Sequence, residues 1–155
     1  MPPSPAGMTP GFARRRAAHL RLGARGERLA AGLLRRLGLE ILARNYRAPD
    51  GEVDLVARAD AVLCFVEVKT RHRRRHARPA DAVGLEKRRR IIRAARRYRR
   101  ELGWPAVIYR YDIVEVVLNG RRLREVRYWP AAFNEADTDA ADRLPHFDPD
   151  DDALE

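Results

Sequence analysis

The stretch GEVDLVARADAVLCFVEVKT, residues 51–70, decides the fold of this chain. Two apolar runs, at 52–57 and 62–70, flank a short polar connection at 58–61, and this order predicts a β-hairpin. Apolar side chains occupy consecutive positions in both runs, which is typical of strands that are covered on both faces. We therefore expect the hairpin to lie inside a sheet with further layers on both sides.

Charged side chains interrupt this hairpin at Asp54, Glu67 and Lys69. If the loop is centred between Asp60 and Ala61, directly opposed positions place Asp54 against Glu67. Because side chains alternate along a strand, Glu67 and Lys69 share one face, and Asp54 joins them from the neighbouring strand. Opposed carboxylates repel each other, and a shared proton, a nearby lysine or a bound cation would relieve the repulsion. A divalent metal beside Lys69 relieves it best, because Mg²⁺ favours one or two carboxylates with water and phosphate oxygens.

Lysine usage points to the chemistry of this cluster. Only two of the 32 basic residues are lysines, Lys69 and Lys87. A lysine ammonium is a compact charge whose pKa shifts on desolvation, whereas arginine stays charged, so a lysine beside two carboxylates suggests a chemical role. The alternative explanation is that two lysines remain by chance in a composition that favours arginine. A metal, two carboxylates and a lysine fit phosphodiester hydrolysis, in which Lys69 orients the attacking water or stabilises charge in the transition state.

Composition limits the class of protein. The 155 residues correspond to about one domain, and the net charge of +10 predicts a polyanionic partner, most often nucleic acid. A single cysteine excludes an intramolecular disulfide. There is no apolar run long enough to span a membrane and no secretory signal, so we expect a cytoplasmic protein that does not associate with membranes.

Periodicity and turn residues predict the order of the elements. The expected fold class is α/β, a mixed sheet flanked by helices in the order α-β-β-β-α-β-β. The expected elements are a helix at 21–37, a strand at 40–46, the hairpin at 52–57 and 62–70, a helix at 81–102, and a second hairpin at 107–118 and 123–129.

Charge divides the chain into three expected segments. Residues 1–130 carry a net charge of +18 and residues 131–155 carry −8. We expect a mobile basic Pro/Gly/Arg-rich arm at 1–20, the folded domain at 21–130 and an acidic disordered tail at 131–155.

Basic residues after the first hairpin are candidates for phosphate contacts. Such a run is most simply a solvated loop, but on a basic protein it also favours nucleic-acid binding. The candidates are Arg71, Arg73, Arg74, Arg75 and Arg78. Two acids stay outside the candidate site: Glu52 is expected to pair with Lys69, and Asp112 to pair with Arg110 or to buttress the sheet edge.

Three motifs give the chain a family resemblance: GARGE at 23–27, GEVDLV at 51–56 and FVEVKTR at 65–71. With them the sequence resembles the PD-(D/E)XK nuclease superfamily and, more closely, the YraN family of bacterial predicted endonucleases, related to archaeal Holliday-junction resolvases. The resemblance covers residues 20–118 and implies a restriction-endonuclease-like fold.

The resemblance also implies roles for single residues. It makes Asp54 and Glu67 metal ligands, Lys69 the catalytic lysine and Glu27 a further active-site acid, although helical spacing alone would make Glu27 a surface salt-bridge residue. Lys87 matches a family position and is expected to contact phosphate.

The expected function is therefore a Mg²⁺- or Mn²⁺-dependent endonuclease acting on DNA, with branched or damaged DNA as substrate. The analogy with resolvases implies a homodimer. Two alternatives remain at this point: a nucleic-acid-binding module of the same fold without turnover, and an RNA- or ribosome-associated basic protein.

Overall fold

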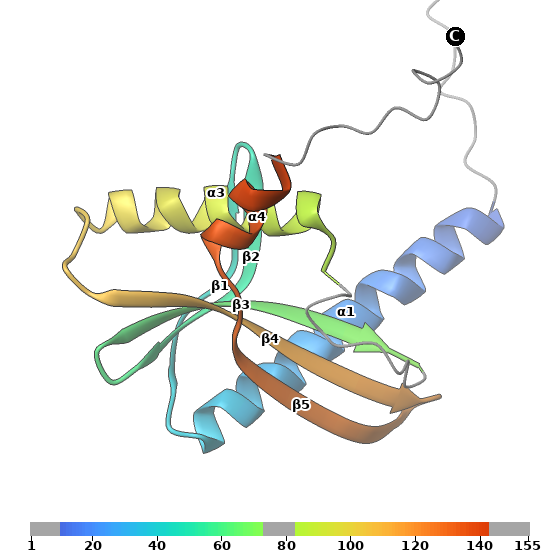
Figure 1. Cartoon of the computed structure of the whole chain (residues 1–155). Helices are drawn as coiled ribbons and strands as arrows, with labels where there is room; N and C mark the ends of the chain where they lie inside the picture. Colours follow the sequence, from blue (N-terminus) through green and yellow to red (C-terminus); the bar gives the residue numbers. More distant parts are fainter. Residues whose placement is uncertain (1–9, 73–82, 143–155) are drawn as a thin grey trace, which may run out of the picture.

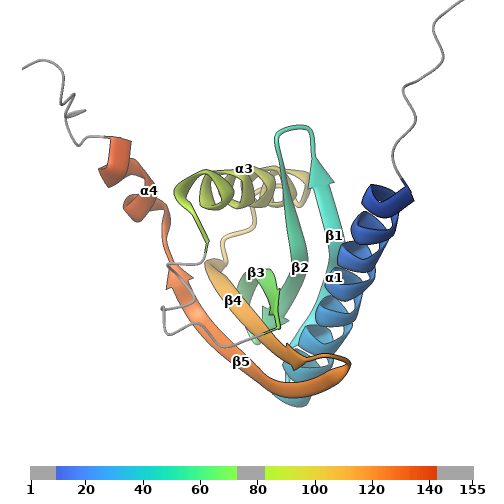
Figure 2. The same ribbon diagram turned by 90° about the vertical axis from the view of Figure 1, so that its right-hand side faces the viewer.

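A five-stranded mixed sheet with a helix on each face forms the centre of the molecule (Figures 1 and 2). The computed structural model describes residues 10–72 and 83–142. Its elements are α1 (Pro10–Arg36), β1 (Glu40–Ala48), β2 (Gly51–Ala59), β3 (Val62–Arg71), α3 (Leu85–Glu101), β4 (Ile108–Asn119), β5 (Arg122–Phe133) and α4 (Glu135–Asp142). The predicted fold class and element order are confirmed.

The strands lie in the order β1-β2-β3-β4-β5. Neighbouring strands are antiparallel except β3 and β4, which are parallel. The parallel pair follows from the connection through α3, because a chain needs a crossover segment to return to the same end of the sheet. This crossover brings α3 back over the hairpin that carries the candidate site.

Two separate apolar cores hold the layers together. On one face, Leu34 of α1 packs with Leu55 and Cys64; on the other, Ile91 of α3 packs with Val56 and Phe65. Burial on both faces explains the consecutive apolar residues of β2 and β3. The β2–β3 hairpin is thus covered on both faces, as the sequence predicted.

The register of the first hairpin matches the prediction. Asp60 and Ala61 form the turn, and Asp60 takes a φ of 51°, a conformation that aspartate tolerates. Opposed pairs run from Ala59–Val62 to Leu55–Val66. Continuing this register by one residue places Asp54 opposite Glu67.

The N-terminal boundary differs from the prediction. Helix α1 begins at Pro10, so residues 10–20, predicted to be a mobile arm, belong to a helix. Alanine and arginine are among the strongest helix formers, and the stretch is rich in both. Its many positive charges were therefore a poor sign of mobility. Residues 1–9 lie outside the described residues.

The C-terminal boundary also differs. Strand β5 continues to Phe133 and α4 covers Glu135–Asp142, where an acidic disordered tail was predicted. Asn134 and Asp137 cap α4 reciprocally, each backbone N–H donating to the other's side-chain oxygen at 3.1 and 3.0 Å. The ring of Phe133 stacks on Tyr111 at 5.1 Å. Residues 143–155 lie outside the described residues.

Within residues 10–72 and 83–142, none of the helices combines the length and the apolar character that crossing a membrane requires.

Candidate active site

The acidic and basic residues of β3 lie at the end of the hairpin away from its turn. Glu67 and Lys69 follow Phe65 at alternate positions and so share the face that α3 covers. The Lys69 ammonium Nζ lies 3.5 Å from Glu67 Oε1, and only 3% of Glu67 is exposed. The structure therefore brings the predicted acid and lysine of β3 into an ion pair.

Asp54 reaches the same place from β2. Its Oδ2 accepts a hydrogen bond of 2.8 Å from the backbone N–H of Val68, beyond the last regular pair of the hairpin. Burial, and then the nearby Asp54 carboxylate, raise the pKa of Glu67 well above its ordinary value. The two predicted metal ligands thus stand together, as the register required.

One oxygen of Glu67 has no hydrogen-bond donor. Oε1 faces Lys69, whereas Oε2 is buried and has no hydrogen-bond partner among the described residues. A buried carboxylate oxygen without a donor or cation is costly. This oxygen and the Asp54 carboxylate make a hard-oxygen donor pair.

Lys87 lies beside the carboxylates of the candidate site. Its Nζ lies 3.2 Å from Glu52 Oε1 and 3.8 Å from Glu67 Oε1, at the N-terminal end of α3. The residue predicted to contact phosphate is thus placed among the carboxylates. Glu52, expected to pair with Lys69, pairs with Lys87 instead, because α3 folds back over the start of β2.

Glu27 approaches from the α1 side of the sheet. Burial raises its pKa, a hydrogen bond with Asn45 opposes this, and the charges of Asp54 and Glu52 raise it further. The preceding Gly26 sets the depth of α1: a Cβ there would stand 1.9 Å from Thr70 Oγ1. A larger residue at 26 would have to displace the Thr70 side chain or lift α1, so glycine favours the close packing that brings Glu27 within electrostatic range of Asp54.

Glu115 is a buried acid that sequence reasoning did not identify. It lies beside Lys69 in the parallel register of β3 and β4, and its Oε1 is 3.5 Å from Arg71 Nε. Arg71, predicted to bind nucleic acid, is therefore paired within the protein. No local signal marks Glu115, because β4 joins β3 across a long stretch of chain. The other predicted basic residues of this loop, Arg73, Arg74, Arg75 and Arg78, lie outside the described residues.

Asp112 has a structural role, as expected. It accepts hydrogen bonds from Arg110 Nε at 3.0 Å, the Tyr128 hydroxyl at 2.5 Å and the Ala131 N–H at 2.9 Å. These bonds fix β5 against β4, so the expected pair of Asp112 with Arg110 is confirmed.

The donor set fits a small hard cation. Among the described residues, no group of three or more His, Cys, Asp and Glu has a metal-binding arrangement. Mg²⁺ does not need one, since it commonly takes one or two carboxylates and completes its shell with water and substrate phosphate. Asp54 and Glu67, with the unpartnered Oε2, are the residues that fit Mg²⁺ or Mn²⁺.

Basic side chains line a series of hollows beside the site. The first, about 510 Å³, contains Glu27. Arg21 and Arg25 also line a second hollow of about 630 Å³. His72 lies between this second hollow and a third of about 730 Å³, and lines both. The remaining basic residues along these hollows are Arg28, Arg44, His19, Arg121, Arg122 and Arg124. Positive charge thus runs from Glu27 along α1 to the β4–β5 turn.

Known proteins share most of this chain. The model of the uncharacterised protein family UPF0102 matches residues 26–116. A UPF0102 protein of Syntrophotalea carbinolica is 47% identical over 115 residues, which are 74% of this chain and 93% of that protein. A UPF0102 protein of Chlorobaculum parvum is 43% identical over 121 residues, 75% of this chain and 94% of that protein.

The matched segment runs from α1 to β4 and contains Glu27, Asp54, Glu67, Lys69 and Lys87. The match and the shared coverage together place the chain in the family that its motifs indicated: it belongs to the uncharacterised protein family UPF0102.

Proposed function

We propose that this protein is a metal-dependent endonuclease that hydrolyses phosphodiester bonds in DNA. The observation that carries the proposal is the convergence of Asp54, Glu67 and Lys69, with one buried Glu67 oxygen that has no hydrogen-bond partner in the described part of the chain. A cation bound between Asp54 and Glu67 would satisfy this buried oxygen and offset the repulsion between the two carboxylates.

Each side chain has a task that its position supports. Asp54 and Glu67 would hold the cation, which when bound polarises a phosphoryl oxygen and lowers the pKa of water. Lys69, whose side chain is one-third exposed, has an ammonium that can reach both Glu67 and a phosphate outside. It would orient the attacking water or stabilise the charge that develops on phosphate.

Lys87 acts in this scheme as a positioning residue. Its ammonium holds Glu67 Oε1 and Glu52 Oε1, and so fixes Glu67 with Oε2 directed away from that contact. Glu27 adds a further acid from α1, close enough for its pKa to respond to Asp54.

The basic hollows support nucleic acid as the substrate. Arginine guanidinium groups bind phosphate oxygens through paired donors, and Arg21 and Arg25 continue the row of positive charge that reaches Glu27. The resemblance to Holliday-junction resolvases supports branched DNA, acted on by a homodimer. Cleavage of four-way junctions in preference to linear duplex is the expected result.

Cleavage assays test the proposal. Linear, single-stranded and four-way-junction DNA are incubated with wild type, Asp54→Ala and Lys69→Ala, with and without Mg²⁺ or Mn²⁺. Glu40→Gln is the matched control, because Glu40 is an exposed carboxylate that pairs with Arg58 far from the site. Metal-dependent cleavage by wild type and Glu40→Gln, lost in both site variants, is expected.

The alternatives give different results. Tight DNA binding by wild type with no cleavage under either metal would refute the nuclease and leave a binding module. Preference for RNA in a salt-titrated competition would instead favour an RNA-associated protein.

A further inference from the structure

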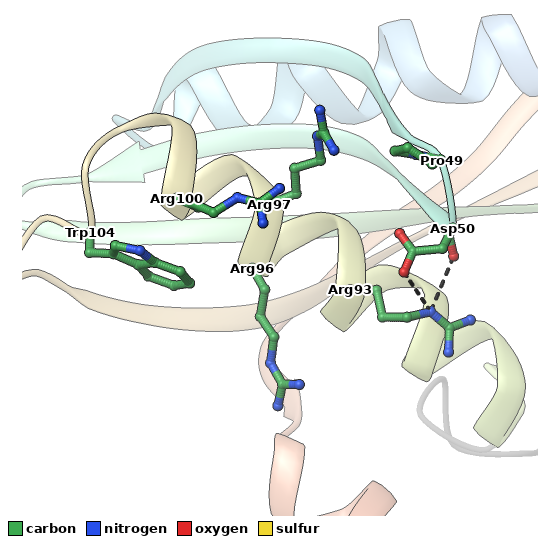
Figure 3. A pocket seen from close by; sticks show the side chains of 7 residues that line it. All are labelled: Pro49, Asp50, Arg93, Arg96, Arg97, Arg100 and Trp104. Atoms are coloured by element: carbon green, nitrogen blue, oxygen red, sulfur yellow. Dashed lines mark hydrogen bonds and ion pairs between the residues drawn. The ribbon is translucent and has the colours of Figure 1, made fainter.

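A fourth charged hollow lies on the outer side of α3, away from Asp54 and Glu67 (Figure 3). Its volume is about 470 Å³. Figure 3 shows Trp104 at one end and Asp50 at the other, with arginines of α3 between them. The residues that line it are Pro49, Asp50, Arg93, Arg96, Arg97, Arg100 and Trp104.

The four arginines form one face of the helix. Their spacing, at 93, 96, 97 and 100, repeats every three or four residues, which places side chains along a single stripe. The opposite side of α3 is buried through Ile91, Ile92, Ala94 and Ala95. The arginine face is therefore an outward surface of the molecule.

The end of α3 holds Trp104 in a fixed position. Gly103 takes a φ of 75°, and its N–H donates to Arg100 O while the Trp104 N–H donates to Arg99 O, both at 2.9 Å. The Arg99 guanidinium lies 3.6 Å from the Tyr109 ring centre and 5.3 Å from that of Trp104. The indole is still 54% exposed, so it forms a preorganised aromatic surface beside the arginines.

Acidic neighbours pair with three of the four arginines of this face. Asp50 is the one carboxylate that lines the hollow, against four guanidinium groups. Arg93 pairs with Asp50 at 3.5 Å and with Glu86 at 3.4 Å. Arg96 pairs with Glu135 at 2.9 Å and Arg97 with Glu101 at 3.2 Å. A guanidinium carries five N–H donors, so a pair at one edge leaves donors for a second anion. The arginines of this face therefore keep N–H donors for phosphate oxygens beyond their ion pairs.

We propose that this arginine face and Trp104 bind single-stranded nucleic acid, with phosphates on the guanidinium groups and a base stacked on the indole. An exposed indole stacks only on an unpaired base, because bases within a duplex already stack on each other. The ligand is therefore a single-stranded segment and not intact duplex.

This surface differs from the candidate active site. Lys87 lies at the other end of α3, and Arg97 is ten residues further on, which is about 15 Å along the helix. One strand can reach both places, but binding to the arginine face needs neither metal nor hydrolysis. The two proposals therefore succeed or fail separately.

Tryptophan fluorescence provides the test, because the chain has only Trp104 and Trp129. A single-stranded oligodeoxythymidylate is titrated into Lys69→Ala protein without metal, in a Trp129→Phe background that leaves Trp104 as the reporter. We expect the oligonucleotide to quench Trp104 fluorescence in this protein. In the matched Trp104→Phe protein, which keeps Trp129 as its reporter, the fluorescence should change little. The same strand annealed to its complement should not quench Trp104.

Charge variants test the arginines. Arg97→Ala/Arg100→Ala is compared with Arg35→Ala/Arg36→Ala, which removes the same charge from the last turn of α1. The first pair should weaken binding about tenfold and make the slope of log affinity against log salt shallower by about 1.4, as two lost phosphate contacts predict. Equal affinity for the two double variants, or equal quenching of both tryptophans, would overturn the proposal.

Discussion

Gly51, the first residue of β2, lies directly against the backbone of α3. A Cβ at this position would stand 1.9 Å from the carbonyl oxygen of Arg90 and 2.8 Å from its carbonyl carbon. Both atoms belong to the helix backbone, so neither can rotate away as a side chain can. Gly51→Ala must therefore move the β1–β2 hairpin and α3 apart.

The expected cost follows from this contact. Overpacking of a filled interior costs typically about 1–3 kcal/mol, and a rigid backbone neighbour places Gly51→Ala at the upper end, about 3 kcal/mol. For a protein of this size each kcal/mol lowers Tm by about 2–4 °C, so we expect Tm to fall by roughly 6–12 °C. The same movement should separate Lys87 from Glu52.

Urea and thermal unfolding measure this cost, with Gly32→Ala as the matched control. Gly32 also lies in a regular element, but a Cβ there meets nothing within 4 Å. Because alanine favours a helix over glycine, Gly32→Ala should stabilise the protein by about 0.5–1 kcal/mol. If the free energy of unfolding of Gly51→Ala lies within about 0.5 kcal/mol of the wild-type value, the reasoning that the α3 backbone at Arg90 cannot move aside is wrong.

Three further results are expected. Lys87→Ala should lose DNA cleavage but keep nearly the same DNA affinity, because the Lys87 ammonium contacts carboxylates of the site. Equal losses in the single-turnover cleavage rate and in equilibrium DNA binding would contradict this prediction. Burial by itself would raise the pKa of Glu135, but the hydrogen bond from Arg96 outweighs it and lowers that pKa. The Glu135 carboxylate therefore stabilises the folded protein at neutral pH, and this stabilisation is lost as pH falls below about 4. In urea unfolding, the free energy of unfolding should fall more between neutral and acid pH for wild type than for Glu135→Gln. An equal fall in the two proteins would contradict this prediction. Burial raises the pKa of the Cys64 thiol to about 11, so iodoacetamide should modify the protein, by mass spectrometry, only after unfolding in urea; rapid modification of the folded protein would show that the thiol is accessible.

The catalytic proposal depends on how two surfaces of one hairpin are used. One face of β2 and β3 packs against α1 through Leu55 and Cys64, and supplies apolar burial. The other face packs against α3 through Val56 and Phe65 and ends in Glu67 and Lys69. The apolar part holds the strands rigidly, so the charged part can keep carboxylates close together that would otherwise separate.

Local rules were sufficient for the hairpin. A two-residue turn at Asp60 and Ala61 determines every opposed pair, and alternation then assigns each side chain to a face. The opposition of Asp54 and Glu67 could be predicted for this reason. Charge composition predicted the structure at the two ends of the domain less well. The net charge of a segment says nothing of the helix-forming residues at 10–20 or of the helix cap at Asn134.

The sequence by itself determined the strands, their burial on both faces and the pairing that joins Asp54 to Glu67, because turn geometry and alternation act between near neighbours. Tertiary structure decided which further groups meet them. Lys87 reaches Glu67 where α3 rests on Gly51, and Glu27 approaches Asp54 where Gly26 lets α1 pack against Thr70. Such contacts depend on the shapes of surfaces far apart in the chain, and no local pattern of residues encodes them.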